Sequence, residues 1–318
     1  MIRPALVTPA DAATLQDVDP KEVVAALAAD GVVHFQGFDS SEQAFTDFSD
    51  RFSSDFTCDP YKVVANPWNS TRGSVGRVVR RIARTAQRVR ARNRPVNDAS
   101  PARFAPFAGY GLNPHNENCF LPGAFPDLVW FHCNRPAESG GATLLLDGGE
   151  VLGGLDTSTA AFLRDEPIRY TTSLVPAQWQ ATWEVRDRDQ LRNRLDSEPG
   201  TSYELSASGH LDVTFDSTQV FSSNFGGGEV VRTNLLSRQP FDRVNASTTE
   251  ALAGGGKVPG EIVSALLDRA RARTELDLAA GDVILLDNSR MMHGRTPFTD
   301  ERRRITTRCA WLRPELTP

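Results

Sequence analysis

Residues 281–295 read Gly-Asp-Val-Ile-Leu-Leu-Asp-Asn-Ser-Arg-Met-Met-His-Gly-Arg, and the fold prediction starts from this stretch. The apolar run from Val283 to Leu286 predicts a buried strand, because short aliphatic runs bounded by Gly and Asp are typical of strands. Asp287 and Asn288 then predict a turn. His293 follows this turn, so we expect it at a strand end, where a site would open.

Further stretches of the same kind lie on both sides of this one. Turn-forming residues separate them, and few helices lie between. They are residues 128–133, 142–146, 168–172, 209–215 and 304–311. Many short strands in one large domain favour a closed barrel or a two-sheet jelly roll. We therefore expect a mainly β protein with flanking helices.

The amino-terminal part predicts a helix, a strand and a second helix. Asp19 is an N-cap candidate before Pro20, and Gly31 can end the helix in a left-handed conformation. A buried strand over 32–35 follows, and Ser41 begins the second helix. A further helix is expected over 260–272, whereas residues 177–208 carry no clear signal.

Length and composition narrow the class of protein. The chain has 318 residues, a mass of 34.8 kDa and a formal net charge of -5, so we expect one large domain over 1–318 without nucleic-acid binding. No apolar run approaches the roughly 18–20 residues of a membrane helix, and the amino terminus lacks a signal-peptide pattern. A cytoplasmic protein is expected. Its four widely spaced cysteines predict no disulfide framework.

An arginine-rich segment interrupts this pattern at about 71–100. Nine arginines lie between residues 72 and 94, with apolar residues interleaved. The pattern predicts a basic helix, insertion or lid, and a solvated helix face is the simpler interpretation. If the segment is a docking surface, an acidic carrier protein would be its natural partner.

His115-Asn116-Glu117 is the first candidate for a metal site. In an extended segment the side chains of His115 and Glu117 point the same way, so both could bind one metal. His293 could supply a third ligand. Two histidines and one carboxylate leave three open positions on an octahedral metal, as in non-haem Fe(II) oxygenases. The remaining histidines are expected in the core, His34 and His132, or on the surface, His210.

Arginines near the carboxyl terminus suggest an anion site. If residues 304–308 form a strand, then Arg304, Thr306 and Arg308 share one face. Two guanidinium groups on an inward face would need anions, and a dicarboxylate cosubstrate is one such anion. Pairing with acidic neighbours such as Asp300 or Glu301 is the alternative.

These motifs together resemble a known family. His115-Asn116-Glu117, the run FPDLVWFHCNRPAESGGAT over 125–143 and the run GDVILLDNSRMMHGRTPFTDERRR over 281–304 are similar to the TauD/TfdA (taurine dioxygenase-like) family, in its SyrP-like branch. The resemblance implies a cupin-like jelly roll, the double-stranded β-helix. It also implies Fe(II) with 2-oxoglutarate and O2 as cosubstrates.

The resemblance also implies roles for single residues. His115, Glu117 and His293 match the iron ligands, Thr143 matches the residue that hydrogen-bonds 2-oxoglutarate, and Arg304 matches the arginine that binds its distal carboxylate. Glu117 favours hydroxylation over halogenation, because halogenases of the family carry a small residue at this position.

Arg308 matches a cation that meets an anionic substrate in some family members. We therefore expect hydroxylation of an unactivated C–H bond in a small anionic, amino-acid-like substrate of antibiotic or other natural-product biosynthesis. The same chemistry could instead give desaturation, epoxidation or cyclisation. It could also act on a carrier-tethered substrate. A zinc hydrolase and a metal-binding jelly-roll sensor are alternatives outside it, against which the Thr143 and Arg304 pair argues.

Overall fold

The computed structural model describes most of the chain. The described residues are 2–57, 60, 102–103, 111–226, 228–237, 247–300 and 302–318. The arginine-rich segment expected at 71–100 lies outside them, so its role as an insertion or lid stays a prediction. Within these ranges no helix has the length and apolarity required to cross a membrane.

The amino-terminal elements follow the sequence prediction. Helix α1 (Pro20–Asp30) begins where the Asp19 side chain accepts a hydrogen bond from the Lys21 backbone, and it ends at Gly31, whose φ of 73° is left-handed. Strand β2 (Val32–Phe35) follows. The Ser41 side chain then accepts a hydrogen bond from the Ala44 backbone and caps α2 (Glu42–Asp50).

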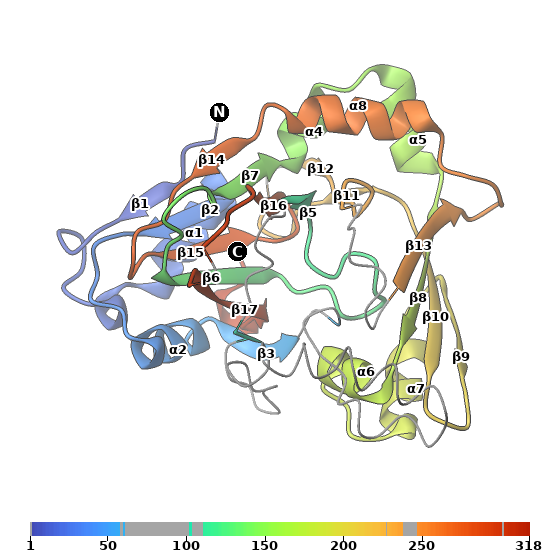
Figure 1. The fold of residues 1–318 in the computed structure, drawn as a ribbon, viewed down its shortest axis with the longest axis horizontal. Coiled ribbons are helices and arrows are strands. Elements are labelled where there is room, and N and C mark those ends of the chain that lie inside the picture. Colours follow the sequence, from blue (N-terminus) through green and yellow to red (C-terminus); the bar gives the residue numbers. More distant parts are fainter. Residues whose placement is uncertain are drawn as a thin grey trace.

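Two β-sheets form the centre of the molecule (Figure 1). The larger has the order β1-β2-β15-β6-β17-β3, with β4 beside β17, and the smaller has the order β14-β7-β16-β5. The larger sheet contains β1 (Ala5–Val7), β2, β3 (Ser53–Thr57), β4 (Ala102–Arg103), β6 (Leu128–Arg135), β15 (Val283–Asp287) and β17 (Arg304–Leu312). The smaller contains β5 (Leu112–His115), β7 (Thr143–Asp147), β14 (Thr274–Leu276) and β16 (Met291–Arg295).

The space between the two sheets is an apolar core. Val129, Ile284 and Cys309 of the larger sheet pack in one cluster with Leu145 and Met291 of the smaller. All five side chains are buried. Two sheets joined through one such core confirm the expected mainly β jelly roll with flanking helices.

The other face of the larger sheet is covered by the amino-terminal helices. Trp130 of β6 packs edge-on against Phe45 and Phe48 of α2, and α1 contributes Leu27 to the same cluster. Both faces of this sheet are therefore covered. His132, expected in the core, is buried on β6, and His34 is buried on β2 beside Asp282.

The middle of the chain forms a second layer, in which the strands expected over 168–172 and 209–215 are present and helices lie in the stretch that carried no clear signal. A sheet of order β13-β8-β10-β9 packs with helices α6 and α7 around Tyr170, Trp179 and Leu191. Its elements are β8 (Ile168–Leu174), α6 (Pro176–Trp183), α7 (Arg188–Asp196), β9 (Thr201–Leu205), β10 (Leu211–Ser217) and β13 (Ser247–Leu252). The remaining elements are α4 (Gly148–Gly153), α5 (Thr157–Asp165), β11 (Val220–Ser222), β12 (Glu229–Val231), α8 (Gly260–Ala270) and two short 3-10 helices, Leu15–Asp17 and Pro314–Leu316.

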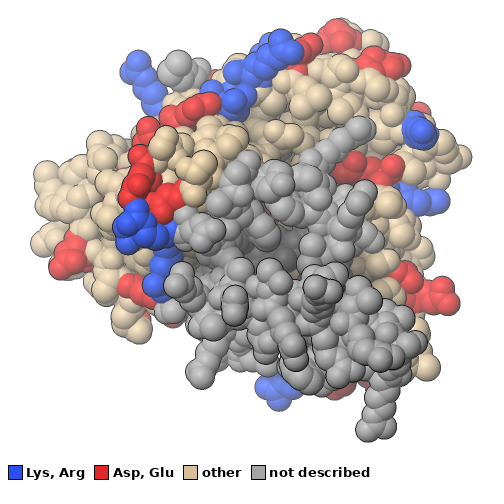
Figure 2. All heavy atoms as spheres, in the orientation of Figure 1, with Lys and Arg blue, Asp and Glu red and all other residues tan. Residues whose placement is uncertain are grey.

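Charges of both signs are distributed over the surface. On the face shown in Figure 2, the described Lys and Arg side chains alternate with Asp and Glu rather than forming one field. Ion pairs such as Arg164 with Glu229 and Arg169 with Asp216 link strands and helices. Each exposed pair contributes little, with a median of about 0–1 kcal/mol.

Candidate metal centre

His115, Glu117 and His293 lie together in the structure. One ligand atom of each can be chosen so that all three lie within 4.8 Å of one another. The Glu117 Oε2 is 3.3 Å from the His293 Nε2 and 3.9 Å from the His115 Nε2. Two imidazole nitrogens and one carboxylate oxygen on one side of a small space form the donor set of a facial metal triad.

The two histidines lie on neighbouring antiparallel strands. His115 ends β5, and it is the direct partner of His293 in β16. Their ring centroids are 4.7 Å apart. His293 lies in the middle of β16, not at a strand end as expected. Its ring packs against Phe131 of β6, so the larger sheet supports one wall of the site.

Glu117 does not lie on the strand of His115. Strand β5 ends at His115, and the chain then turns, with Asn118 at a φ of 57°. The prediction that one extended segment carries both ligands was therefore wrong. The turn brings the Glu117 carboxylate back over the histidines, where the residue is 2% exposed.

Two asparagines hold this turn. The Asn288 side chain accepts a hydrogen bond from the Glu117 backbone at 2.9 Å and donates to the Glu117 carbonyl at 3.1 Å. The Asn116 side chain donates to the Asn288 carbonyl at 2.7 Å and accepts from the Thr233 backbone at 3.1 Å. Both asparagines are fully buried. Both asparagines are part of the motifs quoted above, but no role in holding Glu117 was predicted for either.

The His115 ring is oriented for ligation through Nε2. Its Nδ1 lies 2.9 Å from the Asn113 carbonyl, which can only accept, so Nδ1 carries the proton and Nε2 keeps its lone pair. Backbone support of this kind is usual for metal-binding histidines. The donor set and its orientation therefore fit a divalent iron or a similar metal.

Thr143 lies on the same side of the smaller sheet as the triad. In the pairing of β7 with β16, His293 faces Leu145 and Arg295 faces Thr143. Because alternate residues of a strand share a face, Thr143 and Arg295 lie two residues along from Leu145 and His293, or about 7 Å. Thr143 is buried.

Arg304 and Arg308 share a face as expected, but the prediction that this face points inward was wrong. Arg308 pairs with Trp130 in the sheet, on the side covered by α2, and its guanidinium lies 2.6 Å from the Asp50 carboxylate. Arg304 is near the surface, 3.4 Å from the Glu42 carboxylate. On this strand Cys309 faces the core between the sheets. Because alternate residues of a strand share a face, Ile305 and Thr307 point to the same side as Cys309.

Two other arginines, to which the sequence analysis gave no role, lie near Thr143. The guanidinium carbons of Arg295 and Arg303 are 4.6 Å and 5.0 Å from the Phe298 ring centroid. Burial, and then the positive charge of Arg303, lowers the pKa of Arg295 to about 10. Burial also lowers the pKa of Arg303. A buried cation beside a half-buried one forms an environment that favours an anion.

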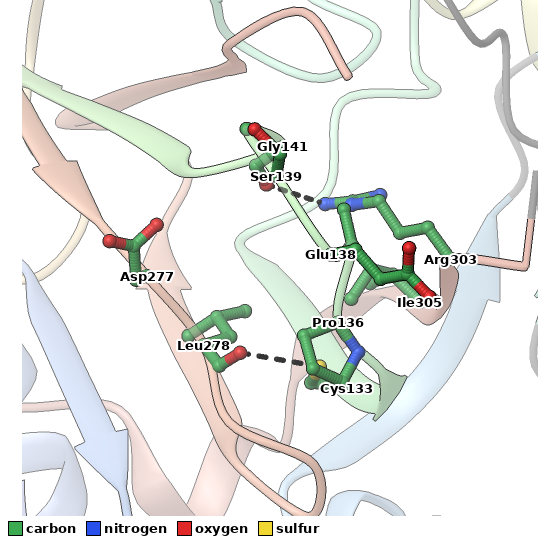
Figure 3. A pocket seen from close by; sticks show the side chains of 11 residues that line it. Cys133, Pro136, Glu138, Ser139, Gly141, Asp277, Leu278, Arg303 and Ile305 are labelled. Carbon is green, nitrogen blue, oxygen red and sulfur yellow. Dashed lines mark hydrogen bonds between the residues drawn. The ribbon is translucent and has the colours of Figure 1, made fainter. Parts of the chain in front are cut away.

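Arg303 also borders a pocket of about 260 Å³, shown in Figure 3. Its guanidinium donates a hydrogen bond to the Gly141 carbonyl at 3.1 Å. On the other side of the pocket the Cys133 thiol faces the Leu278 carbonyl. The pocket is thus formed by residues that flank Thr143 and its partner strand β14.

Cys119 and the other described cysteines carry free thiols. Cys119, Cys133 and Cys309 are all buried and form no disulfide. Burial raises the pKa of the Cys119 thiol to about 12. Cys119 lies beyond the turn at Glu117, not on a common strand face with it, and an unionised buried thiol of this kind serves packing.

Comparisons with known proteins agree with this architecture. The chain is 25% identical over 210 residues to the dapdiamide synthesis protein DdaC of Enterobacter agglomerans. The match covers 59% of this chain and 62% of DdaC. The chain thus aligns with less than two thirds of this curated relative.

Solved structures show the same fold at low sequence identity. PvcB of Pseudomonas aeruginosa is 12% identical with a TM-score of 0.56, over 98% of this chain and 87% of PvcB. A second PvcB structure, described as an Fe, alpha-ketoglutarate dependent oxygenase from an isonitrile synthetic pathway, has a TM-score of 0.53, with 13% identity over the same shares. AAD-2 in complex with Mn(II) and N-oxalylglycine has a TM-score of 0.54 at 13% identity, over 100% of this chain and 98% of AAD-2.

A family model settles the relationship at the level of sequence. It matches residues 3–310, which include the whole triad, Thr143 and the arginines of β16 and β17. The chain belongs to the taurine catabolism dioxygenase TauD, TfdA family.

Proposed function

We propose that the protein is an Fe(II)/2-oxoglutarate-dependent dioxygenase that hydroxylates an unactivated C–H bond of a small, anionic, amino-acid-like substrate. The observation that carries the proposal is the cluster of His115, Glu117 and His293, in which Glu117 and His293 are buried and His115 is half-buried. Membership in a dioxygenase family supports it.

The three ligand residues would hold iron on one side and leave the opposite side open for cosubstrates and substrate. Bound iron with 2-oxoglutarate and O2 supplies the oxidation of the C–H bond, with succinate and CO2 as coproducts. The chain contributes the ligand geometry, which Asn116 and Asn288 fix through the turn. It also keeps water away, since Glu117 and His293 are 2% and 5% exposed.

Thr143 and the Arg295–Arg303 pair are the residues that we propose to hold the distal carboxylate of 2-oxoglutarate. Arg295 and Thr143 lie about 7 Å along their strands from His293 and Leu145, on the order of the length of a five-carbon dicarboxylate. An anion beside the two guanidinium groups would offset their repulsion. The assignment of Arg304, implied by family resemblance, is the competing hypothesis.

The substrate class rests on the relatives and on the family. DdaC is named for dapdiamide synthesis, and PvcB is described as part of an isonitrile synthetic pathway. A biosynthetic role for this chain is our proposal by analogy. A carrier protein as partner stays a prediction, because the basic segment that suggests it lies outside the described residues.

Single substitutions of the triad test the proposal. His115→Ala, Glu117→Ala and His293→Ala should each abolish Fe(II)-dependent formation of succinate from 2-oxoglutarate. Loss of a supporting residue around a metal often costs about 10–100-fold, so loss of a ligand should cost at least that much. His210→Ala is the matched control, because the His210 side chain is 42% exposed and lies near Asp212 rather than in the triad. Full activity in any triad variant would remove that residue from the metal site.

The cosubstrate arginines are distinguished by their effect on the KM for 2-oxoglutarate. Arg295→Gln and Arg303→Gln should each raise it by about tenfold or more, since a lost charged hydrogen bond is worth about 1.5–3 kcal/mol. Arg304→Gln, near the surface beside Glu42, should leave it unchanged. If Arg304→Gln alone raises this KM, the assignment from family resemblance holds and ours fails.

A further inference from the structure

Arg232 is a guanidinium that the proposed function has not used. It follows β12, and its backbone is fixed by a hydrogen bond to the Gln219 carbonyl. The guanidinium carbon lies 3.4 Å from the ring centroid of Phe221 and 4.2 Å from that of Phe125. The cation is thus held between two aromatic rings, which orient it and leave its edge available for an anion.

Arg232 is largely shielded from water, and the part of the chain that the structure describes places no acid in an ion pair with it. Burial lowers its pKa to about 10, from an ordinary 12.5. Among the described residues no carboxylate forms an ion pair with it, and its Nε has no hydrogen-bond partner. A cation that stays charged near neutral pH in such a setting is costly unless an anion meets it.

Arg308 shows the contrast within the same chain. Arg308 is buried, and Asp50 and the Thr46 carbonyl satisfy its guanidinium. Arg308 was the cation expected to bind the substrate, and its contacts are those of a structural ion pair between β17 and α2. If the substrate is anionic, its cationic partner is therefore a residue other than Arg308.

Arg232 lies near the turn of the metal centre, as one backbone hydrogen bond and one shared pocket residue indicate. The backbone of Thr233, its neighbour, donates to the side chain of Asn116, which lies between two triad residues. Cys119, two residues beyond Glu117, lines the same pocket as Arg232. An anion at Arg232 would therefore lie beside the turn that carries Glu117.

The pocket itself has the chemistry of an amino-acid site. Its volume of about 250 Å³ lies just below the roughly 300–1,000 Å³ typical of small-molecule sites. Phe125, Phe215 and Trp311 supply apolar walls, and Glu198 supplies a carboxylate. Arg194, also in the lining, is engaged by the Gly123 carbonyl.

We propose that this pocket holds the polar end of the substrate, a small α-amino acid with an apolar side chain. Its carboxylate pairs with Arg232 and its ammonium group with Glu198, while its side chain lies against the aromatic walls. This inference rests on the proposed function, because it names the substrate class of the proposed oxygenase. The binding it describes can be measured without turnover.

The test uses the Mn(II)-loaded full chain and three probes with one aromatic body. L-phenylalanine carries both charged groups, phenylacetate carries only the carboxylate, and phenylacetamide carries neither. Affinities from calorimetry should fall in that order. Arg232→Met should remove the preference for phenylacetate over phenylacetamide, a loss of about tenfold or more, which corresponds to 1.4 kcal/mol. Glu198→Gln should remove the preference for L-phenylalanine over phenylacetate.

Controls separate this inference from the proposed function. Arg192→Met, on the same helix α7 as Arg194 but paired with Asp189 at the surface, should keep the probe preferences of the wild type. Arg232→Gln, which removes the charge but keeps a polar side chain, replaces Arg232→Met if the latter does not fold. The inference is overturned if the wild type does not distinguish phenylacetate from phenylacetamide, or if this preference survives in a folded Arg232→Met or Arg232→Gln variant. Failure of the proposed function appears elsewhere, as wild-type protein that forms no succinate.

Discussion

At the scale of single residues, the metal site depends on groups that are not ligands. Asn288 makes three side-chain hydrogen bonds, two of them to the backbone of Glu117 and one to the Pro126 carbonyl. Because a turn residue has no strand ladder to fix it, these bonds determine where the Glu117 carboxylate lies. Asn288 is therefore a positioning residue.

Replacement of this side chain tests that role. Asn288→Ala leaves the buried Glu117 N–H without its acceptor, at a cost of about 1–3 kcal/mol. We expect Mn(II) affinity to fall about 10–100-fold, as for other residues that support metal ligands. Asn288→Asp, which can still accept from the Glu117 N–H, should recover part of the loss. Asn224→Ala, which removes a more exposed bond to Asp127, is the control. Equal Mn(II) affinity in wild type and Asn288→Ala would contradict the positioning role.

At the scale of elements, strand positions were easier to predict than strand faces. The apolar run from Val283 to Leu286 lies within β15, and the caps at Asp19 and Ser41 begin the helices they predicted. These signals are local, because each depends on residues within one turn or strand. The polar helix α7 gave no such signal, since only Leu191 and Leu195 of its nine residues are buried.

Strand β17 shows why the faces were harder. Alternation correctly places Arg304 and Arg308 on one side, but α2 covers that side and the smaller sheet lies across from the other. When both faces of a strand are covered, the pattern does not tell which face belongs to the site. Asp50, the partner of Arg308, comes from α2, 258 positions earlier in the chain, so no local pattern could reveal the pair.

At the scale of the whole molecule, the family resemblance supplied what local patterns did not. Mainly β architecture follows from strand counting, whereas the meeting of His115 with His293 requires the pairing of β5 with β16, which are far apart in sequence. Arg232 and the two asparagines were not predicted for the same reason. Their roles depend on neighbours that only the closed jelly roll brings together.

The triad joins β5, its following turn and β16, so metal binding should stabilise the fold as a whole. A ligand that binds only the folded state adds about 2.7 kcal/mol at a hundredfold excess over its Kd. We therefore expect Mn(II) to raise the Tm of the wild-type chain, and His115→Ala, Glu117→Ala and His293→Ala to reduce this shift strongly. Thermal unfolding with and without Mn(II) measures this shift. A shift of the same size in the His293→Ala variant would show that the metal stabilises the chain elsewhere.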